Sequence, residues 1–245
     1  VVDESVAPPP GWDGPTGRAR PRGGHWAAAA YKDSDSVCIF SRDPGSGNLI
    51  PHTLFEDETG DIEELNGVHQ LTFHGEHLYT SSFYDDAVCL FTLEQEAANT
   101  TWQFDGSWEE FGSVSEPQPE YEGGVPGEYG AEYEADIGTL NYTQGLAVSP
   151  DGGWVAVCAG SNDALCLWKR DLVDGSLQPA AAIQEGAVQE GTEGLSGPLP
   201  GFSGPLEGLD GPRTVLWAPQ SSETDPLSLY CAASNSSALL VLEEW

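Results

Sequence analysis

Three polar side chains occupy matching positions in similar stretches of the sequence, and their types suit hydrolytic chemistry. His69, Gln144 and Arg213 each stand just before the apolar centre of a short segment. An arginine can stabilise an oxyanion and a histidine can act as a general base. The alternative is that all three are strand-entry residues that hydrogen-bond to a neighbouring element. We therefore take the three as candidate ligand-binding residues, with His69 and Arg213 as catalytic candidates.

Metal binding is the second chemistry to weigh. His74 and His77 lie close together on either side of Gly75 and Glu76, and could hold a divalent ion. The alternative is an ordinary polar turn. The carboxylate-rich loops could attract Ca²⁺ by charge, but none has the ligand spacing of a calcium loop. We therefore expect no cofactor, with Ca²⁺ as the open alternative.

The chain has five cysteines. Cys38, Cys89 and Cys166 recur at one position of a repeated apolar run, where a buried thiol can serve as a small apolar side chain. Cys158 and Cys166 flank the turn around Ser161 symmetrically, so they could face each other across a hairpin. They are a candidate disulfide, and two separately buried thiols are the alternative.

Internal repetition defines the elements that would position these residues. Four apolar runs share one pattern and have the length of buried strands: 35–40, 86–91, 163–168 and 237–242. A second repeated segment precedes three of them: 67–73, 142–148 and 211–217. Each unit reads as strand, turn, strand, turn, strand, usually with a fourth strand. A four-stranded antiparallel meander in tandem copies predicts an all-β protein, a β-propeller of about four blades.

Two stretches resemble a known family. The run 145–152, Gly-Leu-Ala-Val-Ser-Pro-Asp-Gly, with 161–165 and 169–171, is similar to the lactonase-like (YVTN-type) β-propellers. The run 208–215 resembles the start of a blade in the same group. The resemblance implies the propeller fold and, in the enzymes of that family, polar and charged residues around the channel mouth that hold the substrate. Blades of this kind serve many roles, so the resemblance specifies fold more than function.

The boundaries follow from the repeat. We expect an extended tail over 1–23 and one propeller domain over 24–245. Its blades are predicted near 24–62, 66–113, 141–186 and 208–245, with acidic, Gly/Pro-rich insertions at 105–140 and 184–210.

The two ends of the repeat are expected to be incomplete. The first unit lacks an innermost strand, and the last stops after its third strand. A propeller must close or leave bare strand edges. Three solutions are open: residues 1–6 could supply an outer strand, two chains could close one ring, or the chain could belong to a larger propeller.

Composition excludes several functions. Forty acidic residues against eight Lys and Arg give a net charge of −32, which would repel a nucleic acid. No apolar stretch is long enough to span a bilayer. Such a charge favours cations, basic partner surfaces or a salty medium. We expect a protein partner, or further propeller blades from another chain.

The compartment is indicated by sequons and by the first residue. Sequons occur at Asn99, Asn141 and Asn235, and the chain starts with Val1 rather than Met. The first residue indicates a processed product or a segment of a longer protein, and the sequons favour one that is secreted or lumenal in an organelle.

The sequence favours a non-catalytic scaffold that binds a protein or assembles into a larger complex, because the channel mouth is sparse and the end blades are incomplete. A lactonase-type hydrolase is the first alternative. An acidic, calcium-associated surface protein is the second.

Overall fold

The computed structural model describes residues 15–19, 24–96, 99–108, 140–184, 187–190, 208–220, 222 and 225–243. Within these residues the chain consists of β-strands and one short 3-10 turn, η1 (Lys32–Ser34). The strands form four antiparallel sheets, in which strands consecutive in sequence are paired. This confirms the all-β propeller with about four blades. No helix in the described part is long and apolar enough to cross a membrane.

Each sheet is one blade, numbered here in chain order. Blade 1 contains β1 (Gly17–Ala19), β2 (Trp26–Tyr31), β3 (Ser36–Arg42) and β4 (Leu49–Glu56). Blade 2 contains β5 (Val68–His74), β6 (His77–Ser82), β7 (Ala87–Glu96) and β8 (Asn99–Trp108). Blade 3 contains β9 (Thr143–Val148), β10 (Trp154–Ala159), β11 (Ala164–Arg170), β12 (Leu177–Gln184) and β13 (Ala187–Glu190). Blade 4 contains β14 (Pro212–Trp217), β15 (Ser228–Ala233) and β16 (Ala238–Glu243).

Two strands lie where the sequence predicted none. Blade 1 has an innermost strand, β1, inside the segment expected to be an extended tail, and Gly17 pairs with Ala30. Blade 3 has a fifth strand, β13, inside the segment expected to be an insertion. Both strands are short and lack an apolar run, so only their pairing to a neighbour reveals them. Residues 1–6, one of the three open ways to complete the ring, and most of both insertions lie outside the described residues.

The apolar core lies between neighbouring blades, because the two sheet faces that meet at each boundary are buried. We call the face directed to the next blade in the chain the leading face, and the opposite one the trailing face. Val88 and Leu90 on the leading face of blade 2 pack with Val155 and Trp168 of blade 3. Leu165 and its neighbours on the leading face of blade 3 pack in the same way against blade 4.

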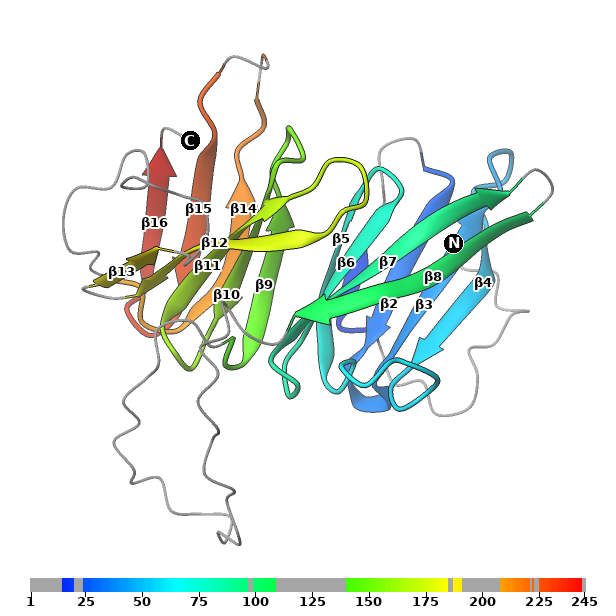
Figure 1. Cartoon of the computed structure of the whole chain (residues 1–245), viewed down its shortest axis with the longest axis horizontal. Helices are drawn as coiled ribbons and strands as arrows, with labels where there is room; N and C mark the ends of the chain where they lie inside the picture. Colours follow the sequence, from blue (N-terminus) through cyan, green and yellow to red (C-terminus); the bar gives the residue numbers. More distant parts are fainter. Residues whose placement is uncertain are drawn as a thin grey trace, which may run out of the picture.

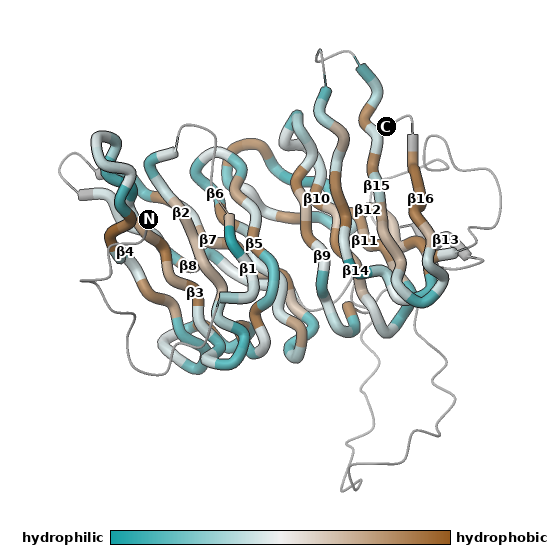
Figure 2. The backbone as a smooth tube through the Cα atoms, turned by 180° about the vertical axis from the view of Figure 1, so that it is seen from behind, coloured by the Kyte–Doolittle hydropathy of each residue, from teal (hydrophilic) through white to brown (hydrophobic). Residues whose placement is uncertain are grey.

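The blades stand in a row that follows the chain. The inner strands β1, β5, β9 and β14 contact one another in this order. Blade 1 lies at one end of the molecule and blade 4 at the other, in the front view and from behind (Figures 1 and 2). The leading face of blade 4 and the trailing face of blade 1 are therefore the two terminal faces of the row.

Aspartates at the start of the third strands connect the blades. Asp35 accepts a hydrogen bond from the backbone N–H of Gly67 at 2.6 Å, and Asp163 accepts one from Gly211 at 2.7 Å. Asp86 makes the same contact with the N–H of Tyr142. These aspartates have positive φ, a conformation that Asp tolerates. In blade 4 the matching residue is a serine, Ser237.

Candidate functional site

The three residues predicted at the channel mouth come together. His69 lies on β5, Gln144 on β9 and Arg213 on β14, which are consecutive inner strands. Arg213 donates from Nη1 to Oε1 of Gln144 at 3.2 Å and from Nε to Oγ of Ser234 at 2.8 Å. The exposed guanidinium thus joins blade 4 to blade 3 while remaining open to solvent.

His69 lies in a positive environment. Burial lowers the pKa of its imidazole, and the nearby Lys32 ammonium lowers it further. Its Nδ1 atom is buried and has no hydrogen-bond partner among the described residues. A neutral imidazole is therefore favoured at this position at neutral pH, which a general base or a hydrogen-bonding ligand contact would require.

Sequence reasoning missed Lys32 and the aromatic rings around it. Its Nζ lies 4.1 Å from the ring centroid of Phe83 and 5.0 Å from that of Tyr84, both cation–π distances. Phe83 also stacks on Tyr142 with a centroid separation of 4.5 Å. The scarcity of basic residues was the available signal, because two of only eight Lys and Arg lie at this end of the inner strands.

His74 and His77 pair across the β5–β6 turn and face blade 3. Nδ1 of His77 accepts a hydrogen bond from Nη2 of Arg170 at 2.5 Å, so the lone pair of that nitrogen is already used by the guanidinium. His74 packs against Gly152. Among the described residues, no group of three His, Cys, Asp or Glu side chains is placed to hold a metal ion. Metal binding here stays a prediction.

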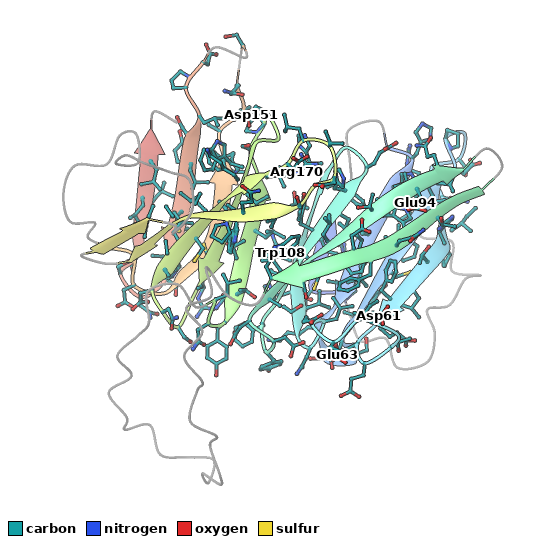
Figure 3. All side chains as sticks on the ribbon, in the orientation of Figure 1. Asp61, Glu63, Glu94, Trp108, Asp151 and Arg170 are labelled. Carbon is teal, nitrogen blue, oxygen red and sulfur yellow. The ribbon has the colours of Figure 1, made fainter. Side chains whose placement is uncertain are left out.

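Arg170 is the centre of a buried contact between blades 2 and 3, near the middle of the molecule (Figure 3). Its Nε donates to the Tyr79 hydroxyl at 2.7 Å, and its Nη1 donates to the Gly152 carbonyl at 3.1 Å. The same hydroxyl donates to the Gly175 carbonyl at 2.5 Å. Burial is the main reason that the pKa of Tyr79 rises to about 12, so the phenol remains neutral. We call Tyr79, Arg170 and Gly175 the latch.

An acidic hollow of about 450 Å³ lies where the ends of blades 1 and 2 meet. Figure 3 labels Glu63 in its wall, together with Asp61 beside it. Two of its carboxylates bind the backbone: Asp57 accepts from the N–H of Leu65 at 2.9 Å, and Asp85 accepts from that of Asn66 at 2.7 Å. Their positions are thus explained by loop structure, and calcium binding stays untested.

The leading face of blade 4 differs from those of the other blades. Leu239 and Val241 on its third strand are 64% and 45% exposed. The matching pair in blade 3, Leu165 and Leu167, is 1% and 0% exposed because blade 4 covers it. Two rows of side chains cross the three strands of blade 4, and all of them except Thr214 are aliphatic or aromatic. In pairing order the rows are Leu216, Tyr230 and Val241, and Thr214, Ala232 and Leu239. This surface was not predicted from the sequence, because the side chains of the last blade were not assigned to the two faces of its sheet.

The candidate disulfide between Cys158 and Cys166 is wrong, since both cysteines are free and buried. Cys158 pairs with Leu165 and Cys166 with Val157, so the two thiols lie on opposite faces of blade 3. Cys158 instead contacts Cys231 of blade 4, with an Sγ–Sγ distance of 3.6 Å. Burial raises the pKa of the Cys166 thiol to about 12, which keeps it protonated and unreactive.

The sequons are only partly described. Asn235 is exposed on the β15–β16 turn, and its side chain donates to Asp210 at 2.9 Å. Asn141 is half-buried, and the side chain of Asn99 lies outside the described residues. Glycosylation at these positions stays a prediction.

No protein-family model and no curated protein sequence matches the chain. Solved structures do match it. A Bacteroides uniformis protein provisionally assigned as a 6-phosphogluconolactonase is 15% identical over 94% of this chain and 53% of its own, with a TM-score of 0.58. Saccharomyces cerevisiae Sqt1 is 10% identical over 94% and 44%, with a TM-score of 0.56. The β-propeller domain of Cps50 (Swd1) from Myceliophteria thermophila is 14% identical over 94% and 54%, with a TM-score of 0.51.

These identities are low enough that the likeness shows the fold alone. The chain has a β-propeller fold, which it shares with a lactonase-like protein and with other propellers, in agreement with the resemblance in its blade sequences. The chain spans 53% to 55% of the length of three of the solved structures that it matches. A propeller fold by itself does not decide between an enzyme and a binding protein.

Proposed function

We propose that this protein is a non-catalytic β-propeller scaffold that binds a protein partner through the leading face of blade 4. The observation that carries the proposal is the exposure of Leu239 and Val241, since the matching residues of blades 1, 2 and 3 are all buried by the following blade. Soluble proteins rarely leave a contiguous apolar surface open, and such surfaces commonly mark interaction sites.

The shape of this face supports a protein rather than a small ligand. It is a sheet surface crossed by two rows of mostly apolar side chains, whereas sites that bury a small molecule are concave. The edge strand β16 has no further strand paired to it among the described residues. A partner could therefore cover the face, pair with the edge, or do both.

Site-specific photo-crosslinking tests this proposal. A photoreactive amino acid at position 239 is expected to crosslink to another polypeptide in the protein's native source. The same amino acid at Val173, which is 88% exposed at the tip of the β11–β12 turn, is the matched control. Crosslinks from position 239 but not from position 173 would support the proposal. An absence of crosslinks from position 239 would refute it.

A lactone hydrolase is the second candidate, because His69, Lys32 and Arg213 lie near one another in a strongly acidic chain. In this alternative, Arg213 would stabilise the oxyanion and His69 would be the general base. Lactone hydrolysis by the purified chain that is lost in Arg213→Ala and His69→Ala would favour it. Absent hydrolysis, or hydrolysis unchanged by both substitutions, would exclude these roles.

A further inference from the structure

We propose that the occupant of the leading face of blade 4 is blade 1 of a second copy of this chain, so that two copies close an eight-bladed ring head to tail. The inference rests on the proposed function and names its partner. Inside the chain, leading faces pack on trailing faces at every boundary between blades. The same contact between two copies would cover the exposed leading face of blade 4, as a closed two-fold ring requires. On the trailing face of blade 1, Tyr31 and Cys38 are already buried in the single chain, so the contact there would involve the turn after the third strand and the outer strand, where Leu54 is 37% exposed.

The latch between blades 2 and 3 supplies the specific argument. Tyr79 stands on the leading face of blade 2, and it contacts Arg170 and Gly175, which end the third strand and form the next turn of blade 3. Strand pairing places Tyr230 at the position of Tyr79, since Tyr79 pairs with Thr72 and Tyr230 pairs with the matching Leu216. Blade 4 thus carries the tyrosine half of a latch on its exposed face.

Blade 1 carries the other half. Arg42 ends its third strand and Gly47 lies in the turn that follows, at the positions of Arg170 and Gly175, and both glycines have a φ of 79°. In blade 3 the space beside Gly175 is filled by His77 and Tyr79 of the preceding blade. In blade 1, before which no blade is described, the Arg42 guanidinium lies beside Gly47 instead.

The remaining boundaries lack both halves together. The positions that match Tyr79 hold Ala28 in blade 1 and Ala156 in blade 3. The positions that would match Arg170 hold Leu93 in blade 2 and Glu244 after β16. The leading-face tyrosine of blade 2 is thus followed by an arginine in blade 3. The leading-face tyrosine of blade 4, Tyr230, meets the same partner when blade 1 of another copy, with Arg42, comes next.

Size and charge are compatible with this ring. Propellers commonly contain up to eight blades, and this chain spans 53% to 55% of three solved structures that it resembles. Each copy carries a net charge of −32, so long-range electrostatic repulsion between two copies opposes their association. Salt screens exposed charges beyond about 8 Å at physiological ionic strength, so the fraction of dimer is expected to rise with salt.

Particle mass and paired variants test the inference. The purified chain is expected to form a particle of twice 26.0 kDa, measured by sedimentation at several protein and salt concentrations. Leu239→Asp on the leading face and Arg42→Glu on the trailing face are each expected to weaken the dimer by at least about 10-fold. Val173→Asp is the matched control and should leave the dimer unchanged. Circular dichroism melts check that every variant is folded.

Mixing the two variants separates a head-to-tail ring from other dimers. A pair made of one Leu239→Asp chain and one Arg42→Glu chain has one unaltered interface, so the mixture should recover a dimer that neither variant forms alone. A dimer that Arg42→Glu leaves intact would overturn the head-to-tail arrangement. A wild-type monomer at every salt concentration, or an open polymer, would overturn the ring. Crosslinks from position 239 to a different protein would then leave the proposed function standing without this partner.

Discussion

The leading faces of blades 2 and 4 have the same strand pairing and similar residues, yet one is buried and the other is open. Tyr79 on blade 2 is 0% exposed, and its hydroxyl binds Gly175 and Arg170 of the next blade. Tyr230 on blade 4 is half-exposed at the matching position. The comparison teaches that these faces are built for another blade, and that burial depends on whether one follows.

The largest difference in the free energy of unfolding is expected between matching substitutions on the third strands of blades 3 and 4. Leu167→Ala removes a side chain from the core between blades 3 and 4 and should lower the free energy of unfolding by about 2–5 kcal/mol. Val241→Ala, at the matching exposed position, should change it by about 0.5 kcal/mol or less in the separated chain. Urea unfolding at low protein concentration measures both values. Equal losses would contradict the contrast between the two faces.

The next largest difference in stability is expected between alanine substitutions at two matching glycines, Gly175 and Gly47. An added Cβ at Gly175 would lie 2.7 Å from the His77 ring, so Gly175→Ala combines a close contact with an unfavourable φ and should cost about 1–3 kcal/mol. At Gly47 the nearest atom is Nη2 of Arg42, 3.2 Å away on a flexible side chain. Gly47→Ala should therefore cost less, about 1 kcal/mol from φ alone. Thermal melts of the two variants compare them directly.

The latch itself should have a slightly smaller effect. Tyr79→Phe removes the hydroxyl that joins Arg170 to Gly175 and leaves buried polar groups with fewer partners, at a cost of about 1–2 kcal/mol. Tyr230→Phe should leave the stability of the separated chain within about 0.5 kcal/mol. If Tyr230→Phe lowers the free energy of unfolding of the separated chain as much as Tyr79→Phe does, the two hydroxyls do not differ in burial and hydrogen bonding, which would contradict the comparison.

The smallest effect depends on pH. Burial and the Arg170 guanidinium lower the pKa of His77 below its ordinary value of 6.5. The unfolded chain therefore binds this proton at a higher pH than the folded chain. The stability from neutral His77 is fully present above pH 6.5 and is lost as pH falls toward the lower folded pKa.

His77→Gln isolates this term, because glutamine keeps an acceptor for Arg170 but does not titrate. The wild type should lose stability relative to His77→Gln as pH is lowered from about 7.5 to about 5. Burial raises the pKa of Asp86 to about 6, which favours the fold at low pH, and this opposite contribution cancels in the comparison. A constant difference between the two proteins would show that His77 does not titrate in this range.

Much of the fold could be predicted, because the repeated apolar runs and matching turns encode their own strands. The site was predicted in part. His69, Gln144 and Arg213 were placed together by the repeat alone, whereas Lys32 lies outside the matched segments and reaches them only in the folded chain. The disulfide prediction failed by one residue of register. Cys158 pairs with Leu165 rather than Cys166, and a one-residue shift moves a side chain to the opposite face of a sheet.

The sequence by itself determined the blade pattern, the acidic charge and the positions that recur in each blade, because these properties are local and periodic. Only the tertiary structure showed which face of each blade is covered. Leu165 and Leu239 stand at matching positions in similar runs, and no local feature separates them. Their burial differs because exposure depends on what packs against a strand, and in blade 4 no described part of this chain covers Leu239 as blade 4 covers Leu165.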